Sequence, residues 1–218
     1  MSDGFADLID VSNRFFRDLK ANNTRAWFQD HKDVFTTEIK KPAELFADLL
    51  AEDLNRITGV PHRPKLFRIH RDVRFSKDKT PYNPHLHFQW GRPDSVTAPN
   101  WFLGSSPDYL IVAMGVMAPG GEALSRYRSF VDARGDEIAG VLAAAPGAHL
   151  SNWGAAPLKR VPKPFDPDHP HGDLLRRKTL ILEAAFPDDW KQAGLVASAN
   201  RVFETMMPLW RVLESGMT

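Results

Sequence analysis

The sequence contains no cysteine, which excludes disulfides, thiolate metal sites, iron–sulfur clusters and cysteine nucleophiles. It also lacks long apolar runs. Stretches such as Tyr109–Met117 fall far short of the roughly 20 residues that a transmembrane helix needs. The first residues, Met1–Asp7, are acidic where a signal peptide would be basic. We therefore expect a soluble, cytoplasmic protein without a membrane partner.

The chain of 218 residues also lacks a strong overall charge, since its formal net charge is only +1. Residues 61–80 nevertheless carry seven basic and two acidic side chains, and residues 159–178 carry six basic and three acidic ones. Two focused basic stretches indicate a local anionic ligand or internal ion pairs, whereas general nucleic-acid binding would favour a basic surface throughout.

The first sixty residues show the apolar spacing of helices. A break is expected at Asn22-Asn23, and Asn23 can cap the helix that follows. Pro42 is expected in the first turn of a further helix, and Gly59 at its end.

The middle of the chain changes to the alternation typical of strands, in residues 66–75, 85–90, 109–116 and 178–186. Residues 197–213 then suggest a closing helix. We predict one α+β domain over residues 1–218, with a mainly antiparallel central sheet flanked by N-terminal and C-terminal helices.

Residues 68–82 form the segment densest in polar chemistry. If this segment begins as a strand, Arg71 falls on the same face as Phe67, Ile69, Val73 and Phe75. A guanidinium on an apolar face must be paired, because an isolated buried charge is very costly. We therefore expect Arg71 to form a structural ion pair, with Asp78 as its partner.

This segment resembles domain-of-unknown-function family 2461, whose signature is R-x-x-R-D-x-R-F-x-x-x-[D/N]-K-x-x-Y. Its positions are filled here by Arg68, Arg71, Asp72, Arg74, Phe75, Asp78, Lys79 and Tyr82. Residues 19–28, 158–163, 166–170 and 174–178 are similar to the family as well. The resemblance implies no activity, because the function of that family is not established.

Two interpretations of the segment stay open. In one, Arg71 and Arg74 hold acidic side chains in a structural ion-pair network. In the other, the segment binds a phosphorylated or other anionic small molecule through charge-assisted hydrogen bonds. The candidate ligand-binding residues are Arg68, Arg74, Lys77, Lys79 and Tyr82 on one wall of a cleft, with Lys159, Arg160, Lys163 and Lys178 on the opposite wall.

Whether the protein is an enzyme stays open at this point. If it is, His70 or His85 would be the acid or base, because imidazole titrates near neutral pH, and Asp72 would orient it. No cofactor can be named, since the sequence has neither a P-loop nor a dinucleotide fingerprint.

Metal binding has a sequence basis in two places. His85 and His87 share a strand face, and ligand types gather again at Asp166, Asp168, His169 and His171. Because His-x-His is common by chance and the second group reads as a rigid turn, we predict no metal site.

Nucleic acid is the main alternative partner, since Phe75, Tyr82, Phe88 and Trp90 flank the basic stretch and could stack on bases. The balanced total charge predicts only weak non-specific binding, so we favour the small anion. A third alternative is a protein-interaction scaffold without a ligand, and the sequence does not set the oligomeric state.

Overall fold

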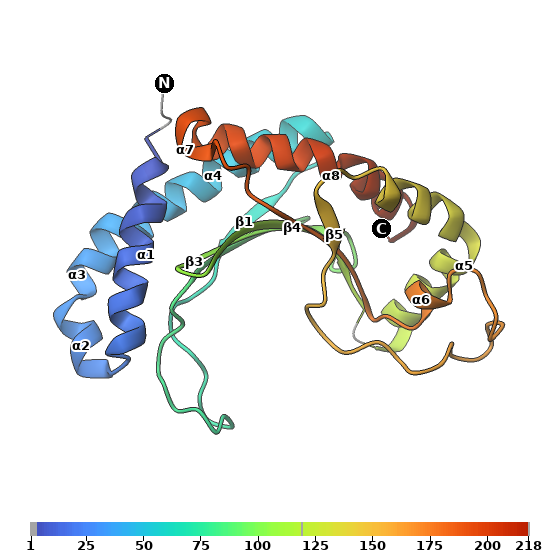
Figure 1. Cartoon of the computed structure of the whole chain (residues 1–218), viewed down its shortest axis with the longest axis horizontal. Helices are drawn as coiled ribbons and strands as arrows, with labels where there is room; N and C mark the ends of the chain where they lie inside the picture. Colours follow the sequence, from blue (N-terminus) through green and yellow to red (C-terminus); the bar gives the residue numbers. More distant parts are fainter. Residues whose placement is uncertain (1–3, 119, 218) are drawn as a thin grey trace. The chain divides into compact units, whose positions relative to one another are not determined.

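The computed structural model describes residues 4–118 and 120–217, and its elements are labelled in Figure 1. The strands are β1 (Arg63–Leu66), β2 (Leu86–Gly91), β3 (Asn100–Ser106), β4 (Tyr109–Met117), β5 (Ala148–Leu150) and β6 (Thr179–Ala185). The helices are α1 (Ala6–Ala21), α2 (Arg25–Asp30), α3 (Lys32–Val34), the π-helix η1 (Phe35–Lys40), α4 (Lys41–Thr58), α5 (Gly121–Ala143), α6 (Gly172–Leu175), α7 (Trp190–Ala193) and α8 (Leu195–Met217). The strands form an antiparallel sheet in the order β1-β2-β3-β4-β6-β5, which confirms the predicted α+β class.

Two compact units divide the chain. Unit 1 comprises the described parts of Met1–Trp90 with Phe102–Ile111 and Phe186–Arg201. Unit 2 comprises the described parts of Gly91–Trp101, Val112–Ala185 and Val202–Thr218. The expectation of a single domain over residues 1–218 stays a prediction. Across the described ranges, no helix combines the length and the apolar character needed to cross a membrane.

In unit 1, the helices of the first sixty residues follow their sequence signals closely. Pro42 lies in the first turn of α4, as predicted, and Gly59 ends that helix with a left-handed φ of 77°. The expected cap of α2 is wrong by one residue. Thr24 is the N-cap, its hydroxyl accepting a hydrogen bond from the backbone N–H of Trp27, and this leaves the side chain of Asn23 for another partner.

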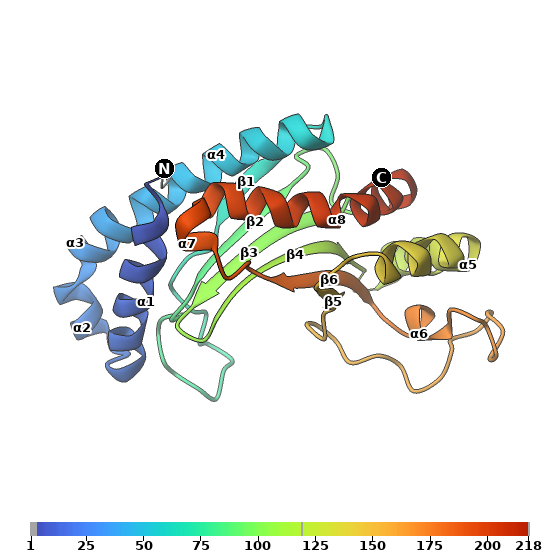
Figure 2. The same cartoon turned by 45° about the horizontal axis from the view of Figure 1, so that its top comes forward.

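Helix α4 covers one face of the neighbouring strands, and Figure 2 shows it running along β1. Phe46 of α4 packs edge-on against Phe88 of β2, with 5.4 Å between ring centroids. The indole of Trp90 donates a hydrogen bond to the backbone oxygen of Ala47, at 2.8 Å. All three aromatic rings are fully buried, so this face of β2 is core and its alternate residues face the other way.

The strand predicted over residues 66–75 is wrong, because β1 ends at Leu66 and residues 67–85 form a long loop, teal to green in Figure 1. Local polar contacts explain the difference. The carboxylate of Asp72 accepts from the backbone N–H of Arg74, and that of Asp78 accepts from the backbone N–H of Thr80. Aspartate bonded to the backbone two residues on bends the chain into a turn and competes with sheet pairing. Phe75, expected on the apolar face, is 95% exposed.

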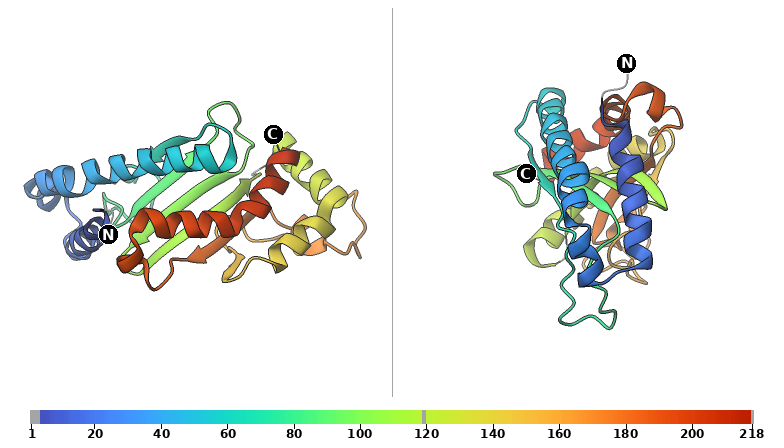
Figure 3. Two further views of the ribbon diagram at one scale, coloured as in Figure 1. Left: turned by 90° about the horizontal axis from the view of Figure 1, so that it is seen from above. Right: turned by 90° about the vertical axis from the view of Figure 1, so that its left-hand side faces the viewer.

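In unit 2, β6 pairs antiparallel with β5, in a register that places Leu150 opposite Leu182 and Ala148 opposite Ala184. Helix α6 packs against α5, where the phenol of Tyr127 donates to the backbone oxygen of Leu174 at 3.0 Å. Figure 3 (left) shows that the red helix α8 changes direction in its C-terminal part. Pro208 lies inside this helix, and a proline there removes a backbone donor and bends the helix.

Candidate functional site

The loop of residues 67–85, called the motif loop below, is folded on itself rather than extended. An isolated antiparallel bridge joins His70 to Tyr82 and draws its two arms together. At its tip, the ammonium group of Lys79 donates to the backbone oxygens of Val73 and Arg74, at 3.0 and 3.4 Å. The loop therefore has internal polar contacts that hold its shape.

Arg71 is the best-anchored cation of the motif loop. Its Nη1 lies 2.6 Å from a carboxylate oxygen of Asp78 and also donates to the backbone and side-chain oxygens of Thr80. The backbone N–H of Thr80, followed by the guanidinium of Arg71, lowers the pKa of Asp78 to about 2, so this carboxylate is charged at neutral pH. Nη1 donates all of these hydrogen bonds. Within the part of the chain that the structure describes, Nε and Nη2 of Arg71 have no hydrogen-bond partner.

The loop is anchored to the segment between α1 and α2 by Asn23. The amide group of Asn23 donates to the backbone oxygen of Tyr82 at 2.9 Å and accepts from its backbone N–H at 3.1 Å. The buried ring of Tyr82 stacks on Phe28, with 4.2 Å between centroids. These contacts fix where the loop begins its return toward β2.

A pocket of about 380 Å³, called the motif pocket below, opens between these segments. It is lined by Lys20, Asn23, Arg71, Asp78, Thr80, Tyr82, Asn83 and Pro84. Lys20 comes from α1, and its ammonium group lies 3.2 Å from the exposed carboxylate of Asp108. Two cations from different segments, one of them with unused donors, can bind an anionic group.

The other basic residues predicted for the first wall do not line the motif pocket. Arg74 makes a two-pronged ion pair with Asp72, with bonds of 2.9 and 2.7 Å, and Lys79 bonds to loop carbonyls. Arg68 and Lys77 are exposed and make no hydrogen bond or ion pair within the described residues. Of the predicted residues, the pocket thus brings together Tyr82 with Arg71 and Asp78.

The candidate acid–base residues also lie outside the lining of that pocket. The ring of His70 contacts Phe28 and Tyr82, and the ring of His85 stacks on His87 at 3.7 Å. Both carboxylate oxygens of Asp72 accept from Arg74. Within the described chain neither histidine is bonded to Asp72, which was expected to orient one of them.

The residues predicted for the opposite wall, Lys159, Arg160, Lys163 and Lys178, belong to unit 2. Lys159, Arg160 and Lys163 lie exposed on the proline-rich loop between β5 and α6. The backbone oxygen of Lys178 accepts from the N–H of Ala118 at 2.8 Å. That this group forms a wall of the anion site stays a prediction.

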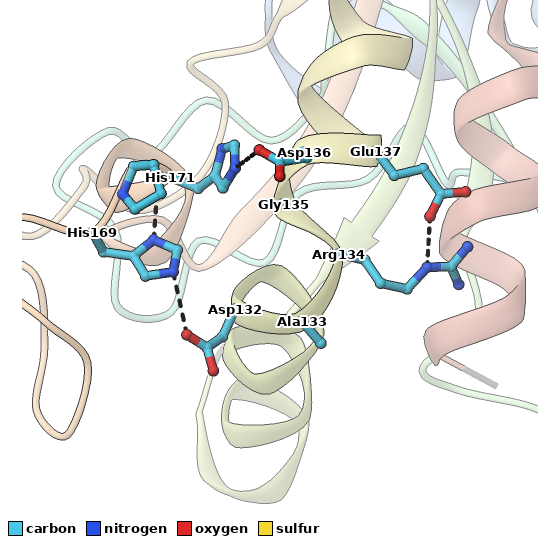
Figure 4. A pocket seen from close by; sticks show the side chains of 9 residues that line it. Asp132, Ala133, Arg134, Gly135, Asp136, Glu137, His169 and His171 are labelled. Atoms are coloured by element: carbon cyan, nitrogen blue, oxygen red, sulfur yellow. Dashed lines mark hydrogen bonds and ion pairs between the residues drawn. The ribbon is translucent and has the colours of Figure 1, made fainter.

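A second pocket, of about 280 Å³, lies beside α5 in unit 2 and is called the α5 pocket below (Figure 4). His169 Nε2 lies 3.2 Å from a carboxylate oxygen of Asp132, and His171 Nε2 lies 2.8 Å from one of Asp136. The backbone N–H of His171 donates to Nδ1 of His169. Since Nδ1 accepts this hydrogen bond, the Nε2 atom is the one that faces the carboxylate of Asp132.

The backbone of α5 leaves helical geometry at Arg134, beside Gly135. A Cβ atom on Gly135 would lie 2.1 Å from Cδ2 of His171, so only glycine lets the imidazole pack this closely on the helix. The sequence predicts a rigid turn at His169 and His171 but gives no signal for their partners on α5, Asp132 and Asp136. Within residues 4–118 and 120–217, no three histidine and acidic side chains lie close enough together to hold a metal ion.

Sequence comparison assigns the chain to a known group. The model of a family described as "Conserved hypothetical protein (DUF2461)" matches residues 12–211. No curated protein matches the chain.

Proposed function

We propose that this chain, which belongs to the DUF2461 family of conserved hypothetical proteins, binds a small anionic group such as phosphate in the motif pocket. Family membership supplies no activity, so the proposal depends on the geometry of the pocket. The lack of cysteine agrees with a cytoplasmic location, which we propose with it.

The proposal rests mainly on which nitrogen atoms of the Arg71 guanidinium are already hydrogen-bonded. Its guanidinium is fixed through Nη1, while Nε and Nη2 keep their donors for a ligand. A guanidinium fixed beforehand loses little side-chain freedom on binding, and its planar donors match the oxygens of phosphate or carboxylate.

The charges around the pocket support an anion more than a cation. The charged residues that line the pocket are Lys20, Arg71 and Asp78, and the one acidic residue among them, Asp78, is already paired with Arg71. Lys20 also lines the pocket, and its exposed pairing with Asp108 is weak enough to be exchanged for a ligand.

Calorimetric titration with inorganic phosphate at low ionic strength tests the proposal. Arg71→Ala should weaken phosphate binding by roughly 10- to 100-fold, as expected for loss of charge-assisted hydrogen bonds. Lys20→Ala, which leaves every hydrogen bond inside the motif loop intact, should weaken it by roughly 3- to 10-fold.

Arg74→Ala is the matched control, because Arg74 belongs to the same loop but is bonded to Asp72 and lies outside the lining. It should change phosphate affinity by less than about threefold. The proposal fails if the wild type shows no saturable phosphate binding at millimolar concentration, or if Arg74→Ala loses as much affinity as Arg71→Ala.

A further inference from the structure

A cluster of rings lies on the face of β2 that points away from α4. It consists of Phe67, His85, His87, Phe102 and Tyr109, called the aromatic cluster below, and all five belong to unit 1. His87 lies at its centre, with ring centroids 3.7 Å from His85, 4.9 Å from Phe102, 6.1 Å from Tyr109 and 6.2 Å from Phe67.

The rings of the aromatic cluster are uncharged at neutral pH. Burial, with a smaller effect of the neighbouring His85, lowers the pKa of His87 to about 3, and burial also lowers the pKa of His85. Two imidazoles stacked at 3.7 Å could not both be protonated without strong repulsion. His87 Nε2 shares a hydrogen bond of 2.6 Å with the phenol of Tyr109, whose pKa is raised by burial. The rings of the cluster are thus neutral and planar, and the ammonium group of Lys65 lies over the ring of Phe67, 4.8 Å from its centroid.

Part of this surface is open to solvent. Phe67 is 40% exposed and Tyr109 is 38% exposed, whereas Phe88 and Trp90 on the opposite face of β2 are fully buried. Single exposed aromatic residues are ordinary, but rings in mutual contact around two stacked imidazoles form a platform for another ring. The ring nitrogens of His85 have no hydrogen-bond partner within the described residues, so a polar heterocycle fits better there than a phenyl group.

Residues of the platform neighbour residues of the motif pocket along the chain at two places. Pro84 lines the pocket, and His85 of the cluster is the next residue, about 3.8 Å further along the chain by Cα. Lys20 also lines the pocket, and its partner Asp108 directly precedes Tyr109 of the cluster. The segments that line the pocket therefore lead directly into the stacking surface.

From this juxtaposition we infer that the ligand is a nucleoside monophosphate, with its phosphate in the motif pocket and its base on the aromatic cluster. The inference rests on the proposed function for the phosphate half and adds the base half independently. A nucleotide joins a compact dianion to a planar, polar heterocycle, which are the two chemistries that the pocket and the cluster offer.

Titrations with adenosine monophosphate and with inorganic phosphate test the two halves separately. The nucleotide should bind roughly 10- to 100-fold more tightly than phosphate, the gain expected from stacking of one base. His85→Ala should remove most of this gain and leave phosphate affinity within about twofold, because His85 is outside the pocket lining. Phe67→Ala, at an exposed ring whose removal spares the β2 strand, is the second test.

Phe75→Ala is the control, because Phe75 is an exposed aromatic residue of the same loop outside the cluster. It should alter neither affinity. Equal affinity for phosphate and nucleotide would overturn the inference and leave the proposed function standing, whereas no binding of either would overturn both. A nucleotide gain that survives in both His85→Ala and Phe67→Ala would also overturn the inference.

Discussion

The motif pocket and the α5 pocket contain similar residue types but differ in how those residues are paired. In the α5 pocket each charged side chain has its own partner: His169 has Asp132, His171 has Asp136, and Arg134 has Glu137. In the motif pocket, Arg71 is held by one nitrogen only and keeps two others for a ligand.

This difference separates a structural contact from a candidate binding site. The three acidic residues around the α5 pocket would repel an anion, and its histidines use their Nε2 atoms to attach the β5–α6 loop to α5. A pocket with titratable residues is not by itself a site. Unused donors of one charge, held in place by other bonds, are the better indication of a ligand.

The largest expected effect in stability is at the α5 pocket. Gly135→Ala places a methyl group 2.1 Å from the ring of His171 and must displace the imidazole from Asp136. Overpacking of this kind should reduce the free energy of unfolding by about 2–3 kcal/mol, measured by denaturant melts. Phosphate affinity should not change.

Gly140→Ala in the same helix is the control. A Cβ atom there has no neighbour within 4 Å, so alanine should stabilise the helix by about 0.5–1 kcal/mol. A neutral effect of Gly135→Ala would show that His171 can move freely and that its pairing with Asp136 does not hold the loop.

The next largest effect should come from the anchor of the motif loop. Asn23→Ala removes both hydrogen bonds to the backbone of Tyr82 and should cost about 2 kcal/mol, because those backbone groups then lack partners. Phosphate affinity should fall as well, since the loop that positions Arg71 is loosened.

Asn22→Ala is its neighbour and control, with a single exposed bond to the carbonyl of Asp18 at the end of α1. It should cost under about 1 kcal/mol and leave phosphate affinity unchanged. If Asn23→Ala destabilises the protein but phosphate binds as before, the loop anchor and the anion site are independent.

A measurement of stability against pH tests whether His87, at the centre of the aromatic cluster, is neutral in the folded protein. The folded-state pKa of His87 is about 3 against 6.5 for a free histidine, so between these values only the unfolded chain takes up the proton. His87 therefore lowers stability as the pH falls from about 6.5 toward 3. Since the ring is partly open to solvent, we expect this effect to be about 1–2 kcal/mol.

His87→Gln keeps a polar group for Tyr109 but does not titrate. Urea melts of both proteins should show that the cost of this substitution is smaller at pH 4 than at pH 7. An equal cost at both values would mean that the pKa of His87 is the same in the folded and the unfolded chain, and that burial does not lower it.

Much of the fold could be predicted from the sequence because its signals are local. Pro42 and Gly59 delimit α4, and the alternating stretches 85–90, 109–116 and 178–186 correspond to β2, β4 and β6. The strand over residues 66–75 could not be rejected from alternation alone. The hydrogen bonds of Asp72 and Asp78 to the backbone two residues further on form turns there and prevent a strand. These hydrogen bonds cannot be read from the alternation of residue types.

The candidate site was predictable only in part, because its residues come from distant segments. Arg71 is paired with Asp78, but the premise from which a pair was predicted, a strand with Arg71 on its apolar face, is wrong. Lys20 and Asn23 line the motif pocket from the end of α1 and the turn after it, and no periodic signal indicates this. The same is true of the contact between His169 and Asp132, which are far apart in sequence. The Asn22-Asn23 break is predictable from the sequence as a helix boundary. That Asn23 anchors the motif loop follows only from the folded structure.

The smallest effect is expected at Asp132, whose side chain is 52% exposed. Because its contact with His169 is a partly exposed ion pair, Asp132→Asn, which keeps the size of the side chain, should cost under about 1 kcal/mol, whereas Asp132→Ala should cost somewhat more. Neither should alter phosphate affinity, since a surface pair of this kind attaches a loop and holds no ligand. Urea melts and phosphate titrations of both variants check this.

A tenfold loss of phosphate affinity in Asp132→Asn would mean that the α5 pocket takes part in anion binding, and a stability loss above about 2 kcal/mol would mean that the pair behaves as a buried one. Either result would contradict the proposed difference between the two pockets. In that comparison the charged side chains of the α5 pocket only pair with one another, whereas Arg71 of the motif pocket keeps donors for a ligand.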